Sequence, residues 1–436
     1  MSTGALKLAS VGPRRKAGAP PIEYSLLLTA TLCLLAFGVV MVFSASSTTL
    51  LLGKSGDSAY YLKRTLLFGV AGLLVMRVLA KHGLRAVSTM TPLLLVASIG
   101  LLFVVLLPGI GMRVNGAQRW IGTGYFQVQP SEIAKVTLVL YGAYMLTRRP
   151  RMVRSIGEMA PYLLGVGLVC LLVIAEPDLG TALVACLTAA AVLTAAGVRM
   201  RDLGLLAGVL GVIVLLAILI EPYRMARLTG FIDPSADPGG AGFQAIQAKI
   251  ALGSGGVFGV GLGESLQKAF YLPEAHTDMI AAVIGEELGL AGITVLVGLY
   301  GLFGYAGLRT AQRAKDRYGK LLAAGLTSLV MVQAVVNLFA VLGLAPLTGV
   351  PLPFVSYGNS SMLVMLAAVG LLLNIASGGT AGIKAVPQSS RTSRSTRNGR
   401  LKAVDGRRSR ATSRHSGGRN SRPRRAGAGR RRRAAG

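Results

Sequence analysis

The sequence predicts an all-α integral membrane protein with ten transmembrane helices, and three observations lead to that prediction. Of the 436 residues, 52% are hydrophobic and only 14% are charged, whereas soluble domains carry about 25% charged residues. Long uncharged runs recur along the chain, and basic residues gather in alternate gaps between them. The chain has too few charged groups to cover a soluble globule, which excludes that class.

The uncharged runs define the spans, because a bilayer core of about 30 Å needs roughly 20 apolar residues per helix. Six runs are long enough on their own: 24–53, 86–112, 159–175, 179–198, 203–220 and 288–308. The run 321–383 has room for two helices on either side of the turn-rich segment 346–361. Two shorter runs, 65–76 and 136–147, span only if flanking charges enter the helix. Those charges are Arg77, Glu132 and Lys135.

Basic residues indicate the orientation of the spans, because they collect in cytoplasmic loops. Counting the N-terminus as the first gap, the odd-numbered gaps and the C-terminal tail hold the densest basic groups. Five of the 17 acidic residues fall in those gaps, and the other 12 lie on or near the opposite face. Both termini are therefore predicted to be cytoplasmic, and one large extracytoplasmic loop, 221–277, precedes helix eight.

The chain is predicted to divide into a basic cytoplasmic N-terminus at 1–22, a ten-helix domain at 23–377 and a cytoplasmic tail at 378–436. From residue 384 the tail has 18 basic residues, one acidic residue and almost no apolar ones, so we expect it to be disordered. Its charge suits anionic lipid or an acidic protein segment, and a tail that only fixes topology is an equal alternative. Nucleic acid is not expected, because no structured binding module accompanies the charge.

Glu132 and Lys135 are predicted to lie just inside the membrane on one face of a helix. Pro130 suits the first turn of that helix, with Gln129 or Ser131 in the N-cap region. A charge near the bilayer centre costs about 2.5–3.5 kcal/mol and by default marks a functional site. The alternative is that Lys135 snorkels to the near interface.

The outer turns on either side of this helix offer further candidates. Trp120 is the only tryptophan, and its indole beside Arg119 suits either an interfacial anchor or a substrate contact. In the turn Glu176-Pro-Asp178, the proline ends one helix, and Asp178 either caps the next helix or contacts a ligand.

The large outer loop and the turns near it carry the remaining candidates. Its glycine-rich segment, 253–263, has no strict G-x-G-x-x-G pattern, so we interpret the glycines as sites of tight turns and close packing. Arg227 lies in the same loop, and Asp278 is predicted at the outer mouth of helix eight beside His276, a second candidate base. Ser356 offers a hydroxyl to a sugar or to a helix cap. No metal-ligand spacing occurs along the chain.

Six motifs along residues 23–377 together resemble the SEDS family (shape, elongation, division and sporulation), the polytopic peptidoglycan polymerases of the FtsW and RodA types. The motifs are Asn-Gly-Ala-Gln-Arg-Trp-Ile at 115–121, Gln-Pro-Ser-Glu-Ile-Ala-Lys at 129–135, Glu-Pro-Asp-Leu-Gly-Thr at 176–181, Phe-Ile-Asp-Pro at 231–234, Leu-Pro-Glu-Ala-His-Thr-Asp at 272–278 and Pro-Phe-Val-Ser-Tyr-Gly-Asn-Ser-Ser at 353–361. Met279 and Asn359 stand where the family often has Phe and Gly. Because Asn tolerates left-handed geometry, we expect the turn to be retained.

The resemblance implies glycosyl transfer between lipid II molecules on the outer face of the cytoplasmic membrane. The essential aspartate of the family falls on Asp278 and its motif lysine on Lys135. An acceptor hydroxyl would attack the anomeric carbon of a diphosphate-linked donor with inversion, so no covalent enzyme intermediate is expected. Asp278 is our predicted base, and the leaving diphosphate needs positive charge, for which the candidates are Arg119, Lys135 and Arg227. The other predicted substrate-binding residues are Trp120, Glu132, His276 and Ser356.

The resemblance also implies partners and a cellular place. These are lipid II, a class B penicillin-binding transpeptidase and other division proteins, at the division septum. The motif at 271–278 and the long basic tail resemble the division type, FtsW, more than the RodA type. A divalent cation, Mg or Mn, could share the diphosphate charge, although no ligand spacing demands one. The alternatives are an elongation-type polymerase, a lipid II flippase and a scaffold that only recruits a transpeptidase.

Overall fold

The computed structural model describes residues 20–52, 58–114, 116–123, 126–268 and 271–383, which are mainly helical. The longer helices of this part are α1 (Ile22–Leu52), α2 (Tyr60–Leu106), α3 (Pro130–Arg148), α4 (Ile156–Ala175), α5 (Leu179–Ala196), α6 (Met200–Ile220), α7 (Pro222–Ile232), α8 (Phe243–Ser254), α9 (Ile280–Arg313), α10 (Arg317–Val341) and α11 (Asn359–Ala376). Two short 3-10 helices are η1 (Pro150–Arg154) and η2 (Pro234–Ala236). The predicted N-terminal region up to residue 19 and the tail from 384 lie outside the described residues.

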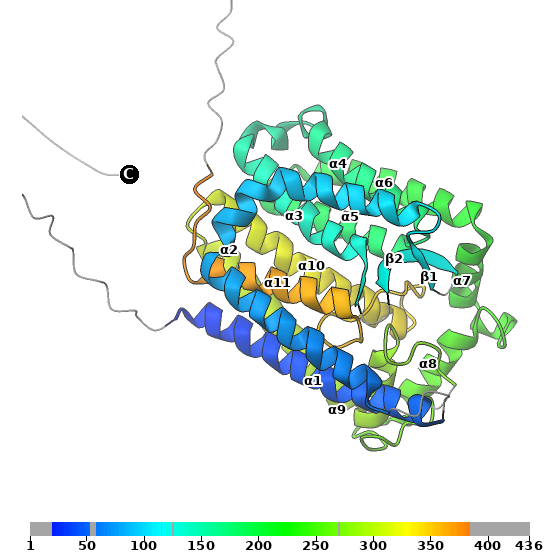
Figure 1. The fold of residues 1–436 in the computed structure, drawn as a ribbon. Helices are drawn as coiled ribbons and strands as arrows, with labels where there is room; N and C mark the ends of the chain where they lie inside the picture. Colours follow the sequence, from blue (N-terminus) through cyan, green and yellow to red (C-terminus); the bar gives the residue numbers. More distant parts are fainter. Residues whose placement is uncertain (1–19, 53–57, 115, 124–125, 269–270, 384–436) are drawn as a thin grey trace, which may run out of the picture. The chain divides into compact units, whose positions relative to one another are not determined.

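Eight helices of the described part are long and apolar enough to cross a membrane, so the chain is a multi-pass membrane protein. They are α1, α2, α4, α5, α6, α9, α10 and α11. The 47 residues of α2 span about 70 Å, enough for two crossings, and Figure 1 shows the helix as two arms. As predicted, Arg77 lies inside α2, and both Glu132 and Lys135 lie inside α3. The number of ten crossings remains a prediction.

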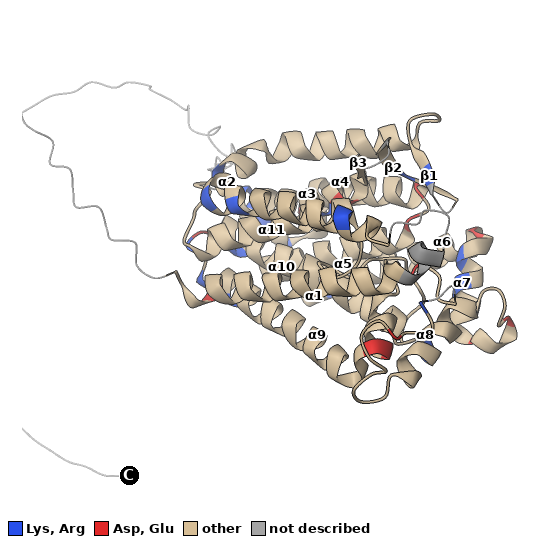
Figure 2. Ribbon diagram, turned by 60° about the horizontal axis from the view of Figure 1, so that its bottom comes forward, with Lys and Arg blue, Asp and Glu red and all other residues tan. Residues whose placement is uncertain are grey.

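The two described ends of the chain lie at the same end of the helix bundle (Figure 1). Near the first end, Glu23 pairs with Arg313 at the end of α9. Near the other end, the amide of Ala381 donates to Asp316 Oδ2 at 3.1 Å. Many of the Lys and Arg residues gather at this end of the bundle (Figure 2). This arrangement agrees with two termini on one side, and the cytoplasmic assignment of that side remains a prediction.

One element departs from the all-helical expectation. Residues between α2 and α3 form a three-stranded antiparallel sheet of β1 (Met112–Val114), β2 (Ala117–Thr123) and β3 (Phe126–Val128). In its register Met112 pairs with Trp120, and Ile121 pairs with Val128. Strands this short are stable only against other elements, here the adjoining ends of α2 and α3, which a sequence pattern does not reveal.

Helix α9 is broken at Gly289, whose φ of 64° and ψ of −161° suit only glycine. The glycine-rich segment after α8 lies against the break and pairs with its backbone. Val260 N donates to Glu286 O at 3.0 Å, and Leu290 N donates to Gly256 O at 3.0 Å. A Cβ atom on Gly259 would lie 2.1 Å from Glu287 O. The predicted role of these glycines in tight turns and close packing is therefore confirmed.

The core is built around α10 and α11. Helix α11 packs mainly on α2, whereas α10 packs on α9, α5 and α3. By contrast, none of the residues of α6 is buried, and its main contacts are with α5 and α7. The irregular segment 344–358 packs against Gly180 of α5. It also accepts hydrogen bonds from Tyr300 of α9 and from Gln333 and Asn337 of α10.

Candidate active site

Asp278 lies two residues before α9, whose N-cap is Met279. Its carboxylate oxygen Oδ1 accepts a hydrogen bond from Thr277 Oγ1 at 3.3 Å. Its backbone carbonyl accepts a hydrogen bond from Asn337 Nδ2 of α10 at 2.8 Å. The side chain is partly exposed. Asp278 is thus at the mouth of the helix, as predicted, with its backbone fixed and its carboxylate still accessible.

Two charged residues set the electrostatics of Asp278. Burial and, to a smaller extent, the negative charge of Glu274 raise the pKa of Asp278 to about 6, and the Arg227 guanidinium opposes both effects. A Cβ atom on Gly349 would lie 3.8 Å from both Arg227 Nη1 and Asp278 Oδ2. The structure therefore brings together the predicted base and one predicted cation. A carboxylate with a pKa just below neutrality suits proton abstraction at neutral pH.

His276 lies in an aromatic cluster rather than in a polar pair. Its ring centroid is 4.4 Å from that of Tyr61 and 5.5 Å from that of Tyr357, and burial lowers its pKa. Its backbone carbonyl accepts from Tyr357 N at 2.9 Å. Ser356 is buried, and its Oγ accepts from Leu352 N at 2.8 Å. That bond makes Ser356 a turn-stabilising residue, and its predicted contact with substrate remains untested.

Lys135 is buried inside the bundle. Its Nζ donates to Glu132 Oε1 at 2.9 Å and to Gln333 Oε1 of α10 at 2.8 Å. The N-cap of α3 is Gln129, with Pro130 at the first helical position, which confirms that part of the prediction. The alternative in which Lys135 snorkels to the interface is wrong, because buried acceptors inside the bundle hold its ammonium group.

Arg119 of β2 binds the outer turn between α4 and α5. Its Nε donates to Glu176 O at 2.9 Å, its Nη2 donates to Pro177 O, and its Nη1 lies 3.8 Å from Asp178 Oδ2. Asp178 also caps α5 by accepting from Thr181 N at 3.0 Å, which confirms the structural interpretation of that residue. These contacts tie Arg119 to the turn, and none joins it to Asp278 in the described part of the chain. Its neighbour Trp120 is half-buried, which leaves both predicted roles of the indole open.

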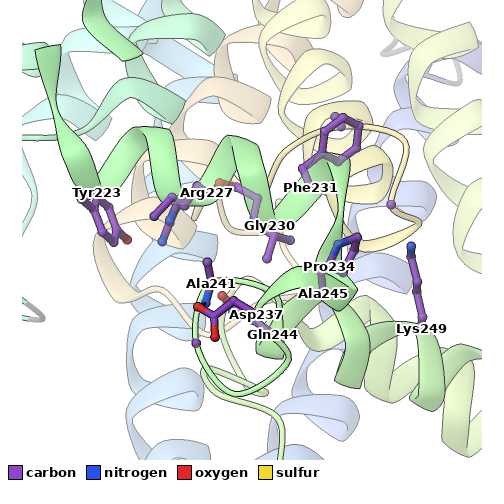
Figure 3. A pocket seen from close by; sticks show the side chains of 16 residues that line it. Tyr223, Arg227, Gly230, Phe231, Pro234, Asp237, Ala241, Gln244, Ala245 and Lys249 are labelled. Atoms are coloured by element: carbon purple, nitrogen blue, oxygen red, sulfur yellow. Dashed lines mark hydrogen bonds between the residues drawn. The ribbon is translucent and has the colours of Figure 1, made fainter. Parts of the chain in front are cut away.

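A cavity of about 330 Å³ adjoins Arg227. Figure 3 shows Tyr223 and Arg227 on α7, with Gln244 and Lys249 on α8 and Asp237 between the two helices. Arg227 lies over the Tyr223 ring at 4.8 Å and donates to Leu347 O at 3.0 Å. The cavity is thus lined by the cations Arg227 and Lys249, the carboxylate of Asp237 and apolar side chains, and Arg227 is the lining residue that also lies near Asp278.

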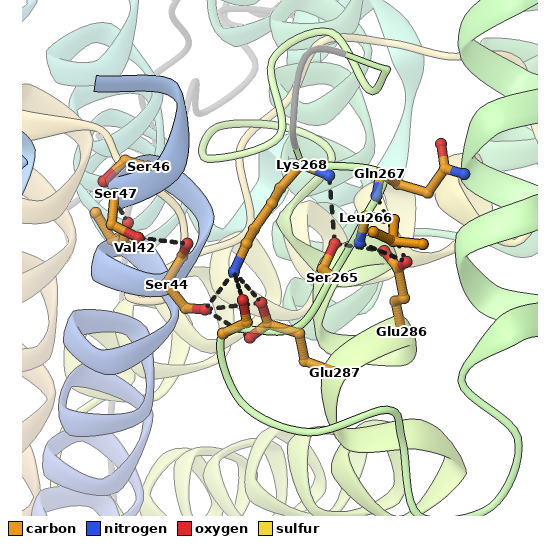
Figure 4. A network of polar contacts seen from close by, with 11 residues as sticks. Val42, Ser44, Ser46, Ser47, Ser265, Leu266, Gln267, Lys268, Glu286 and Glu287 are labelled. Carbon is orange, nitrogen blue, oxygen red and sulfur yellow. Dashed lines mark hydrogen bonds and ion pairs between the residues drawn. The ribbon is translucent and has the colours of Figure 1, made fainter. Parts of the chain in front are cut away.

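A second polar cluster ties the outer loop to the bundle (Figure 4). Lys268 Nζ lies 2.8 Å from Glu287 Oε1 and donates to Gly263 O at 2.6 Å. Ser44 of α1 donates to the Glu287 carboxylate at 2.7 Å, and Ser265 donates to Glu286. We call Ser44, Lys268 and Glu287 the Lys268 network. Its carboxylate, that of Glu287, lies in α9 beyond Asp278 and bonds to Ser44 and Lys268.

Metal binding has no support from side-chain clustering in the part of the chain that the structure describes. No group of three or more His, Cys, Asp or Glu residues there could hold a metal ion. The predicted divalent cation therefore remains a prediction, and no chemistry below depends on it.

Gln333 and Asn337 are site residues that the sequence analysis missed. Both are buried on α10, and their amides bind backbone carbonyls of residues 278, 350 and 351. The sequence feature that could have indicated them is a pair of amide side chains four residues apart in an otherwise apolar span, since polar groups in a span tend to face protein partners.

The fold and the site define a multi-pass helical membrane protein with a carboxylate and cations gathered at one end of its bundle. The model of the FtsW/RodA/SpoVE family, described as cell cycle protein, matches residues 24–380. The chain belongs to this family.

Curated relatives and solved structures agree with that membership. A probable peptidoglycan glycosyltransferase FtsW of Trichlorobacter lovleyi is 42% identical over 84% of this chain and 95% of its own length. Stage V sporulation protein E of Bacillus subtilis is 41% identical over 80% of this chain and 96% of its own. A solved structure on the coordination of polymerization and crosslinking by a peptidoglycan synthase complex matches with a TM-score of 0.67 at 32% identity, covering 80% of this chain and 96% of that one. The rod shape determining protein RodA of Thermus thermophilus matches with a TM-score of 0.59 at 29% identity, covering 80% and 95%.

Proposed function

We propose that this protein is a peptidoglycan glycosyltransferase that polymerises lipid II into glycan strands on the outer face of the cytoplasmic membrane. The observation that carries the proposal is the placement of Asp278 beside Arg227 at the mouth of α9. A carboxylate there can accept a proton while the neighbouring cation faces developing negative charge. Relatives named probable peptidoglycan glycosyltransferase FtsW support the same reaction class.

The reaction is a single inverting displacement. The 4-hydroxyl of an acceptor GlcNAc attacks the anomeric carbon of the donor MurNAc, and the bond from that carbon to the diphosphate oxygen breaks. Its electron pair stays on the diphosphate, whose charge Arg227 offsets. Asp278 takes the hydroxyl proton. An α-linked donor thereby gives a β-linked glycan with no covalent enzyme intermediate. A divalent cation, if the diphosphate carries one, would share its charge.

We further propose a role at the division septum with a class B penicillin-binding transpeptidase as partner. The FtsW names of the relatives support the septal role, and the neighbour that couples polymerization to crosslinking supports the partner. The basic tail from residue 384 would contribute to recruitment through anionic lipid or an acidic segment of a division protein.

Polymerisation of purified lipid II in detergent tests the proposal. Asp278→Asn should lower the rate by about 10²–10⁴-fold, the usual contribution of a general base, while lipid II binding and thermal stability are retained. The matched control is Asp233→Asn, which alters an exposed carboxylate of the same loop that bonds to Ser235 and Ala236, its close neighbours in the sequence. Glycan synthesis by the Asp278 variant at the wild-type rate would refute the assignment.

The flippase alternative is tested in vesicles with lipid II confined to the outer leaflet. A polymerase forms glycan chains there without moving lipid across the bilayer. Transport of lipid II between leaflets without glycan formation would support the flippase instead.

A further inference from the structure

Helix α10 contacts the candidate site through a polar face formed by Gln333 and Asn337. The two residues are four apart, so they share one side of the helix, and both side chains are at most 2% exposed. Gln333 Nε2 donates to Pro351 O at 3.0 Å, and Asn337 Nδ2 donates to Val350 O at 2.8 Å. Two consecutive carbonyls of the irregular segment are thus held by amides one helical turn apart.

The same face also holds the backbone of the proposed base. Asn337 Nδ2 donates its second hydrogen bond to Asp278 O at 2.8 Å. Gly349, next to the clamped carbonyls, lies close to both Arg227 Nη1 and Asp278 Oδ2 and has a φ of +69°. A shift of residues 349–351 would therefore change the spacing of the base and the cation that the reaction needs.

Lys135 fixes the orientation of this amide face. An amide group can turn over and exchange its oxygen and nitrogen, and its partners determine which arrangement is stable. The Lys135 ammonium occupies the oxygen of Gln333, so the nitrogen must face Pro351. Glu132 in turn holds Lys135 at 2.9 Å. The hydrogen bonds of the Lys135 ammonium among the described residues are to Glu132 of α3 and Gln333 of α10.

We infer that Gln333 and Asn337 are positioning residues for Asp278 and Arg227, and that Lys135 acts through Gln333 without contacting the lipid diphosphate. This inference rests on the proposed function. It gives α10 a role in positioning the site residues. It also assigns Lys135 to the organisation of the site instead of to substrate binding.

The first test compares two asparagine-to-leucine substitutions, each of which removes a side-chain amide that binds two backbone carbonyls. Asn337→Leu removes a side-chain amide that bridges two backbone carbonyls at the site. Asn374→Leu removes an amide that bridges Leu79 O at 3.1 Å and Ala80 O at 2.9 Å, on α11 away from the site. We expect similar losses of melting temperature, but a kcat lowered about 10- to 100-fold only in Asn337→Leu, with KM for lipid II unchanged. If Asn337→Leu does not fold, Asn337→Ser, which keeps one donor, should lower kcat by about threefold to tenfold.

Equal kcat values in the Asn337 and Asn374 variants would overturn the positioning role. So would a higher KM at an unchanged kcat, because that pattern indicates a contact with substrate. These outcomes differ from failure of the proposed function, in which the wild-type protein itself would make no glycan or Asp278→Asn would remain active.

The second test is a double-mutant cycle on Lys135. The paired substitution Glu132→Gln with Lys135→Met removes both buried charges at once, which avoids an unpaired ion. If Lys135 acts through Gln333, this pair lowers kcat about tenfold in the wild type but less than about twofold in a Gln333→Leu background. The same factor in both backgrounds would show that Lys135 acts independently of Gln333 and would refute this part of the inference.

Discussion

Two lysine–glutamate pairs are buried in the described part of the chain, and their surroundings differ. The pair of Lys268 and Glu287 has a separation of 2.8 Å, and that of Lys135 and Glu132 has 2.9 Å. All four side chains are at most 2% exposed. Ser44 donates to Glu287, whereas Glu132 Oε2 has no hydrogen-bond partner among the described residues.

The difference indicates a separate role for each ion pair. Burying an ion pair is costly unless further hydrogen bonds satisfy its remaining atoms. The Lys268 network meets that condition, and it ties α1, the outer loop and α9 together. In the pair of Lys135 and Glu132, Oε2 of Glu132 has no hydrogen-bond partner among the described residues, and Lys135 donates one of its hydrogen bonds to Gln333. We conclude that the first pair stabilises the fold, whereas the second organises the site at some cost in stability.

The largest expected effect is on stability at the Lys268 network. Lys268→Met leaves Glu287 charged and buried without its cation, which should cost about 3–5 kcal/mol. The measurement is thermal unfolding in detergent. The charge-free pair Lys268→Met with Glu287→Gln should recover most of the stability and also the polymerisation rate.

The corresponding charge-free pair at Glu132 and Lys135 should recover stability but not the polymerisation rate. If the two charge-free pairs lose the same fraction of activity, the division into a structural pair and a site pair is wrong.

The next effect concerns the glycine-rich segment that the Lys268 network anchors. Gly259→Ala adds a Cβ atom 2.1 Å from Glu287 O at a φ of +82°, so left-handed strain and overpacking should together cost about 2–4 kcal/mol. Gly256→Ala is the control, because its φ is +54° but the space around it is open, and strain alone should cost about 1–2 kcal/mol. Equal unfolding temperatures for the two variants would contradict the close packing against α9.

An effect that depends on pH is expected at Glu176, in the turn that Arg119 holds. Burial and, to a smaller extent, the charge of Asp178 raise the pKa of Glu176 to about 8, against the opposing charge of Arg119. Both carboxylate oxygens lack a hydrogen-bond partner in the described part of the chain. The folded state therefore binds the proton more tightly, so the stabilising contribution is complete below about pH 4.5 and is lost as pH rises through about 8.

Glu176→Gln keeps the size of the side chain and removes its ionisation. The wild type should lose up to about 1.4 kcal/mol per pH unit within that window, and the variant should not. Melting temperatures from pH 5 to pH 9 check this, and parallel curves for the two proteins would show that Glu176 is already ionised in the folded state.

Much of the fold was predictable because a helix that crosses a membrane requires a long run of uncharged, apolar residues. The uncharged runs predicted the helices, and Pro130 and Asp178 indicated where two of them begin. The position of Asp278 at the mouth of a helix was predicted because it comes before an apolar run. The three-stranded sheet was not predictable, because its strands are too short to show a period and are stabilised by neighbouring helices. The division of α9 at Gly289 was also hidden, because a glycine inside an apolar run does not reveal the segment that packs against it.

The candidate site was predictable as a set of residues but not as a set of contacts. Arg119, Lys135 and Arg227 were equivalent candidates in the sequence, and only the fold places Arg227 beside Asp278. Gln333 and Asn337 act on backbone carbonyls of a distant segment, and such contacts leave no spacing in the sequence. Cys170 and Cys186 likewise come within 3.3 Å across α4 and α5 although they lie in separate spans.

The pH dependence of kcat/KM for lipid II polymerisation, which reports the free enzyme, tests the role of the Asp278 carboxylate most directly. The base must be ionised, so the rate should fall about tenfold per pH unit below a midpoint near 6, the pKa of Asp278. Because the charge of Glu274 raises that pKa, Glu274→Gln should move the midpoint to lower pH. A midpoint that stays in place in Glu274→Gln, or a rate that does not fall below pH 6, would contradict Asp278 as the base.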